Sequence, residues 1–143
     1  MPKSFINVAM DDRDMEGGLS MCKVTAYSID GRIIYMADIK QKYVANIIDA
    51  ARKCDYIDKI ILFGSALEER CQESSDMDLA IFGNQPEGKC LTSAKYRKFA
   101  RQLSSFDEFR QNYDLLYFKT GEKYTGMIMK HIMEGETLYE KQG

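Results

Sequence analysis

Apolar and polar positions first follow a regular pattern after residue 20. Residues 23–29 and 32–37 are rich in β-branched and aromatic side chains, which favour strands. Asp30 and Gly31 between them suit a type I′ turn, because both residue types tolerate the positive φ that this turn requires. The pattern predicts a β-hairpin.

A helical period follows the hairpin. Apolar residues recur at the three- and four-residue spacing that places them on one helix face; they are Tyr43, Val44, Ile47, Ile48 and Ala51. Aspartate is a residue type that caps helices. We therefore expect a helix that is capped by Asp38 and ends near Cys54.

Three apolar runs predict strands in the rest of the chain. Residues 59–63 form an uninterrupted run, which is typical of a strand buried on both faces. Residues 76–82 lead into a turn cluster at 83–86, and residues 112–118 form the third run. Together with the helices, the runs predict an α/β (α+β) fold in which helices flank a mixed or mostly antiparallel β-sheet.

Three more segments are predicted to be helical. The first is residues 66–70, the second is the basic amphipathic stretch 93–103, and the third is 122–134, which ends before Gly135. We interpret the lysines and arginines of the second helix as a solvated face. His131 is expected on the surface of the last helix.

Length and charge limit the classes of protein. A chain of 143 residues is long enough for one domain, which we expect to span residues 21–143, with residues 1–20 as a flexible leader. The formal net charge of −2 argues against a dedicated nucleic-acid binder and leaves a nucleic acid only as an acceptor. No apolar run approaches the roughly 18 residues of a membrane span, so we expect a cytoplasmic protein. The four cysteines contain no C-x-x-C pair and indicate neither a zinc site nor a disulfide framework.

Three aspartates are candidates for metal binding. Asp76 and Asp78 stand two positions apart at the start of a predicted strand, so their side chains project from the same face. Asp114 interrupts an apolar strand, where a charge is costly unless it is paired or binds a metal. Carboxylate oxygens are the ligands that Mg²⁺ prefers. Acidic pairs with this spacing also occur elsewhere in the chain, so only the neighbouring residues can indicate whether Asp76 and Asp78 bind a metal.

Gly64 and Ser65, at the end of the preceding strand, supply that context. A glycine lets the backbone approach a ligand closely, and N–H groups at a helix start can face phosphate oxygens. Alone, the pair is more typical of an ordinary strand-to-helix turn with Ser65 as the N-cap. The ten residues that separate it from Asp76 favour a phosphate-binding loop beside the carboxylates.

The segment from Leu62 to Ile81 resembles the G-S-x10-D-x-D signature of the DNA polymerase β-like nucleotidyltransferase superfamily, and above all its small bacterial minimal nucleotidyltransferases. The resemblance returns at residues 113–117, where that family places a third aspartate, and at the ending 132–139. It implies the following site residues: Gly64 and Ser65 for the nucleotide's phosphates, and Asp76, Asp78 and Asp114 for two Mg²⁺ ions, with Mn²⁺ as the alternative. Asp114 would also act as a base near the acceptor hydroxyl.

The implied reaction is transfer of a nucleoside monophosphate, most simply AMP from ATP, to a hydroxyl group with release of pyrophosphate. Minimal nucleotidyltransferases often act with a helical HEPN-type RNase toxin, which they neutralise by adenylylating a tyrosine. The resemblance therefore implies an antitoxin role and such a partner, and an oligomer is compatible with it.

The chain departs from the family directly after Ser65. Many members have an arginine there and a glycine a few residues later, whereas this chain continues from Ala66 through Leu67, Glu68 and Glu69 to Arg70. Triphosphate binding is therefore expected to be weaker, to shift to Arg70 or a lysine, or to be lost. Two alternatives stay open: a binding protein of this fold that neutralises its partner by contact, and a nucleotide-sensing regulator.

Overall fold

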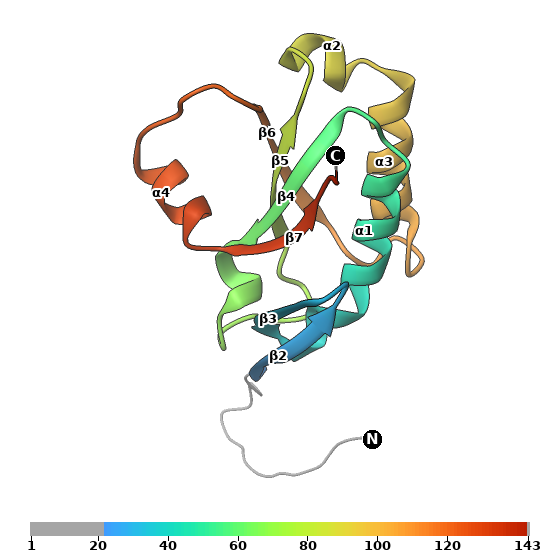
Figure 1. Cartoon of the computed structure of the whole chain (residues 1–143). Coiled ribbons are helices and arrows are strands. Elements are labelled where there is room, and N and C mark those ends of the chain that lie inside the picture. The colour runs from blue at the N-terminus through green and yellow to red at the C-terminus, as the bar shows by residue number, and fades with distance from the viewer. Residues whose placement is uncertain (1–21, 143) are drawn as a thin grey trace, which may run out of the picture.

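The computed structural model describes residues 22–142, so the predicted leader, residues 1–20, lies outside the described part. The elements, in chain order, are β2 (Val24–Ile29), β3 (Arg32–Ala37), the 3₁₀ helix η2 (Asp38–Tyr43), α1 (Val44–Arg52), β4 (Ile57–Phe63), the 3₁₀ helix η3 (Gly64–Leu67), β5 (Met77–Gly83), α2 (Glu87–Leu91), α3 (Ala94–Ser105), β6 (Tyr113–Lys119), α4 (Met127–Met133) and β7 (Glu136–Glu140) (Figure 1).

A four-stranded mixed sheet in the order β6-β5-β4-β7 forms the centre of the fold. β4 pairs antiparallel with both β5 and β7, whereas β5 and β6 run parallel. The predicted mixed sheet with flanking helices is therefore confirmed. The edge strand β7 is not predicted from the pattern, because Leu138 is its only buried residue.

Different helices cover the two faces of this sheet. α1 and α3 lie to the right of the sheet in Figure 1, and α4 lies to the left. On the α1/α3 face, Leu62 and Leu79 belong to a large buried cluster that includes Ile47 and Phe99 from the helices. On the α4 face a smaller cluster joins Met129 and Ile132 of α4 to residues of β4 and β5. Because side chains of a strand alternate between its faces, neighbouring residues of β4 enter different cores.

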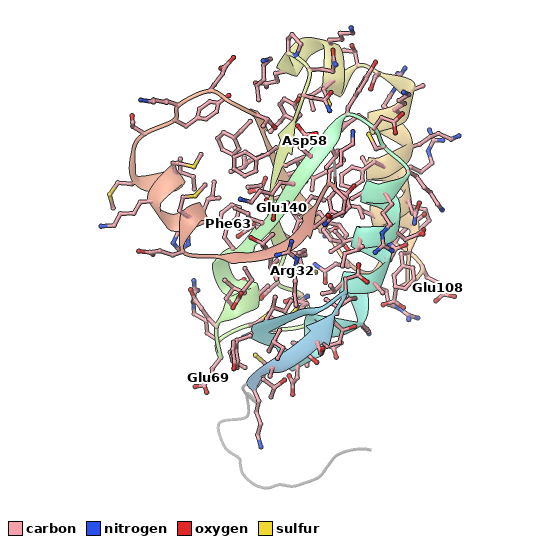
Figure 2. The ribbon with its side chains drawn as sticks, viewed as in Figure 1. Arg32, Asp58, Phe63, Glu69, Glu108 and Glu140 are labelled. Carbon is pink, nitrogen blue, oxygen red and sulfur yellow. The ribbon has the colours of Figure 1, made fainter. Side chains whose placement is uncertain are left out.

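The predicted hairpin is confirmed in detail. Ile29 pairs with Arg32 across Asp30, at φ 50°, and Gly31, at φ 76°, as a type I′ turn requires. The hairpin forms a separate two-stranded sheet. An ion pair of 3.2 Å between Arg32 and Glu140 connects it to β7 (Figure 2).

Several helix boundaries differ from the prediction. Asp38 does not cap α1: residues 38–43 form η2, α1 starts at Val44, and the Asp38 carboxylate accepts a hydrogen bond of 3.3 Å from the backbone N of Lys23. α4 starts at Met127, since the chain turns at Gly121 and Gly126, both with positive φ. α2 is not predicted from the sequence, because a helix of 5 residues is too short to show a helical period.

Within residues 22–142, no helix combines the length and the apolar character that a membrane crossing requires. All four cysteines are buried and free. The lysines and arginines of α3 are exposed, which is compatible with the interpretation of its basic face as solvated.

Candidate active site

Three segments that are distant in sequence meet at one end of the sheet. β4 ends beside the start of β5, because the two strands are antiparallel, and β6 starts there too, because it is parallel to β5. Phe63 pairs with Asp78, and Asp78 pairs with Asp114. Directly paired residues lie on the same face of a sheet. Asp78 and Asp114 therefore share one face, and the alternation from Asp78 to the buried Ala80 makes it the face covered by α4.

Gly64 brings the backbone into contact with this carboxylate. Its φ of +81° is left-handed, and a Cβ atom placed on it would lie 2.2 Å from Oδ2 of Asp78. Only glycine is compatible with both the backbone conformation and the short distance. The loop after β4 and the Asp78 carboxylate are thus side by side, as the sequence predicts.

Ser65 does not act as an N-cap. It lies inside η3, whose N-cap position is Phe63 and which has no side-chain cap, and the Ser65 carbonyl accepts a hydrogen bond of 2.9 Å from the backbone N of Glu68. The ordinary strand-to-helix turn that caps with Ser65 is therefore not what the chain forms here. Ser65 is half-buried beside Gly64.

Negative charge accumulates around Asp78. Burial raises the pKa of the Asp78 carboxyl, and the negative charges of Asp114 and Asp76 raise it further. Asp76, which directly precedes β5, and Asp114 are therefore both close enough for their charges to act on Asp78. Asp76 and Asp114 are exposed and Asp78 is half-buried, so the carboxylates can be reached from solvent.

The three aspartates supply the type of ligand that a hard divalent cation prefers. Carboxylate oxygens suit Mg²⁺, and a cation would offset the repulsion that raises the pKa of Asp78. In the described part of the chain, no group of three or more His, Cys, Asp or Glu residues is arranged so that it could hold a metal ion. The assignment of Asp76, Asp78 and Asp114 as ligands is therefore a proposal.

His131 lies at the site, which its sequence position does not indicate. It is exposed on α4, as predicted, but its ring packs edge-on against Phe63 with the centroids 5.8 Å apart. Phe63 is labelled in Figure 2 at the end of β4, on the side of α4. The charge of His131 lowers the pKa of Asp78 and so opposes the effect of the other aspartates. A single histidine in a short helix carries no pattern that could have revealed this.

Arg70, the predicted alternative phosphate ligand, is exposed and forms an ion pair with Glu68. Ala66, which stands where many family members have an arginine, is fully buried. The loop after Ser65 thus has a packed alanine and an internally paired arginine in place of a cation directed at the phosphates.

A groove with a volume of about 530 Å³ lies between α1 and α3 on the other side of the sheet. Its cations include Lys53 and Lys95, which form ion pairs with Asp49 and Asp55. These pairs reduce its positive charge, and the groove is lined by none of the predicted site residues. We therefore place the candidate site at the aspartates.

The chain matches the family model described as "Polymerase beta, Nucleotidyltransferase" over residues 45–143. The match spans all four strands of the central sheet, whereas the hairpin and η2 precede it. No curated protein matches the chain. Since the matched region covers more than half of the sequence, the chain belongs to the polymerase beta nucleotidyltransferase family.

Proposed function

We propose that this protein transfers a nucleoside monophosphate, AMP from ATP, to a hydroxyl group and releases pyrophosphate. Family membership supports nucleotidyl transfer in general. The observation that carries the proposal is the meeting of Gly64, Asp78 and Asp114 at one end of the sheet. There Gly64, which has no side chain, touches the Asp78 carboxylate, and Asp114 is the partner of Asp78 on the adjacent strand.

In the proposed mechanism each residue has a separate task. Gly64 and Ser65 receive the phosphates, and Asp76, Asp78 and Asp114 would hold two Mg²⁺ ions, or Mn²⁺. When bound, such ions would neutralise the triphosphate and favour an ionised acceptor oxygen. Asp114 accepts the proton of the acceptor hydroxyl, whose oxygen forms a bond to the α-phosphorus while the bond to pyrophosphate breaks. The ring of His131 packs against Phe63, the residue directly before Gly64, so we expect it to lie beside the bound phosphates.

A protein is the acceptor that the surface beside the site favours. On α4, next to His131, three large apolar side chains are exposed: Met127 at 82%, Ile128 at 48% and Met133 at 56%. Clustered apolar residues on a surface mark sites of protein contact. We infer that a helical partner of the HEPN type binds here and presents a tyrosine hydroxyl, which makes the protein an antitoxin.

The test is transfer of label from ATP that carries the label on its α-phosphate. The protein is incubated with Mg²⁺, the labelled ATP and the protein encoded beside it, and the products are separated by gel electrophoresis. We expect the partner to be labelled by the wild type but not by Asp78→Asn. Asp30→Asn is the matched control, because asparagine also suits the type I′ turn. This variant should label the partner as fully as the wild type does. Labelling by Asp78→Asn at the wild-type rate would contradict the proposal.

A second candidate function is neutralisation by contact alone. The observation in its favour is the loop after Ser65, where Ala66 is buried and Arg70 pairs with Glu68. A protein of this kind binds its partner equally well with and without Mg²⁺ and ATP, and Asp78→Asn inhibits the partner as strongly as the wild type. Absence of labelled partner together with such binding would favour this function over transfer.

A further inference from the structure

A fully buried lysine lies beneath the start of β5. Lys40, in η2, is 1% exposed. Its ammonium group donates three hydrogen bonds: 2.9 Å to the carbonyl of Glu73, 2.8 Å to the carbonyl of Ser75 and 2.5 Å to Oε1 of Gln111. An ammonium has three donors, so every one is used. All three acceptors are uncharged.

Gln111 is the second buried polar residue of this cluster, at 2% exposure. Its Oε1 accepts from Lys40, and its Nε2 donates 3.0 Å to the carbonyl of Ser75 and 2.7 Å to the carbonyl of Asn112. The Ser75 carbonyl therefore accepts from both side chains. Lys40 and Gln111 form one closed network, which we call the Lys40–Gln111 node.

The node joins the two segments that lead to the aspartates. Ser75 directly precedes Asp76, and Asn112 stands two residues before Asp114. A backbone hydrogen bond of 3.1 Å from the N–H of Met77 to the carbonyl of Asn112 continues the connection into the strands. The node thus ties the entry of β5 to the entry of β6, at the point where the three carboxylates must be held together.

The energetics point away from a purely stabilising role. Taking an ammonium group out of water costs several kcal/mol, and apolar residues of similar volume often replace buried charges without loss of stability. Lys40 has no carboxylate among its hydrogen-bond partners. Burial lowers the pKa of Lys40, and the nearby charges of Glu73 and Asp76 offset this effect only in part. Three donors that diverge from one atom do, however, fix three acceptors relative to one another, which an apolar side chain cannot do.

Lys40 also lies outside the part of the chain that matches the family, residues 45–143. A second contact from this preceding region reaches the same loop, because the thiol of Cys22 donates 3.3 Å to the carbonyl of Glu68. The region before residue 45 therefore supports the loop between Ser65 and Asp76 at two places.

We propose that Lys40 and Gln111 are positioning residues that set Asp76 and Asp114 relative to each other across the entries of β5 and β6. The inference rests on the proposed function of these aspartates. Neither residue contacts the substrate. Each acts through the backbone carbonyls of the two segments.

The test compares Lys40→Met with Ile47→Val, a conservative change at a fully buried position in α1. Hydrogen exchange measured by mass spectrometry should become at least about tenfold faster in residues 72–77 and 111–115 of Lys40→Met. Exchange in α1 should stay unchanged. In Ile47→Val the exchange of the two segments should stay at the wild-type rate. Wild-type exchange of both segments in a folded Lys40→Met variant would overturn the proposal, and so would faster exchange spread evenly over the chain.

A second readout follows the site itself. The dissociation constant for Mn²⁺ with ATP should rise at least about tenfold in Lys40→Met and stay within about twofold in Ile47→Val. If Lys40→Met does not fold, Gln111→Met, which leaves both carbonyl bonds of Lys40 in place, should show the same loosening of residues 111–115. The hydrogen-exchange measurement does not require a bound nucleotide or metal ion. A wild type that binds no nucleotide but whose segments loosen in Lys40→Met would therefore refute the proposed function and support the node.

Discussion

The two faces of the central sheet perform different tasks. The α1/α3 face contributes to the larger buried core, and its Leu62 and Leu79 are 0% exposed. The α4 face is covered by a helix of seven residues, leaves Leu116 half-exposed and ends at Asp78 and Asp114. One face thus supplies most of the buried apolar area, and the other carries the aspartates that we propose as metal ligands. Under the proposed function, this small fold places its main core and its reactive groups on opposite faces of a single sheet.

The largest effect on stability is expected from the α1/α3 face. Leu79→Ala removes a fully buried side chain from β5 and should lower the free energy of unfolding by about 2–5 kcal/mol. Leu116→Ala, at a half-exposed position on the α4 face of the adjacent strand, should cost about 1–2 kcal/mol. Urea denaturation measures both values. Equal losses would remove the distinction between the two faces.

Gly64→Ala tests the contact between the loop and Asp78. Alanine at a left-handed φ costs about 1–2 kcal/mol, and here its Cβ would also displace the Asp78 carboxylate. Gly31→Ala is the matched control, because Gly31 has a φ of +76° and nothing lies within 4 Å of the added Cβ. We expect both variants to lose stability in urea, but only Gly64→Ala to lose at least about tenfold in nucleotide affinity. Equal affinities in the two variants would show that the contact has no role in binding.

Asp78→Asn should have a small stability effect that depends on pH. The pKa of Asp78 is raised above its usual 3.8, so the folded state holds the proton more tightly than the unfolded state. This contribution to stability is present below about pH 3.8 and is lost as the pH rises through the raised pKa.

Asparagine carries no such proton. Compared with the wild type without metal, Asp78→Asn should therefore gain stability as the pH rises, by less than about 1 kcal/mol because solvent screens a half-exposed carboxyl. Urea midpoints at several pH values measure this gain. A stability difference that does not change with pH would mean that Asp78 is not under repulsion.

The sequence predicted best those parts that are determined by local patterns. Mainly apolar runs located β4, β5 and β6 to within two residues, because partly or fully buried strands need little more than such runs. The spacing between Ser65 and Asp76 pointed to the loop and the carboxylates. The family resemblance implies that Asp78 and Asp114 share a site. The parallel pairing of β5 with β6, which brings them together, is not encoded in the local pattern.

What the sequence could not predict depends on tertiary contacts. Lys40 looks like any helical surface lysine, and only the folded chain buries it against Ser75 and Gln111. β7 consists mainly of polar residues and becomes a strand by pairing with β4. His131 reaches the site because α4 packs across the sheet next to Phe63. None of these three placements produces a periodic pattern of apolar and polar residues in the sequence.

The most direct test of the central claim is calorimetric titration of the protein with ATP in the presence of Mg²⁺. The account predicts binding by the wild type that disappears when EDTA removes the metal. It also predicts that binding disappears in Asp76→Asn, whose lost carboxylate is proposed to hold a metal ion beside the phosphates, and that Asp30→Asn binds normally. Binding by Asp76→Asn with the affinity of the wild type would contradict the account.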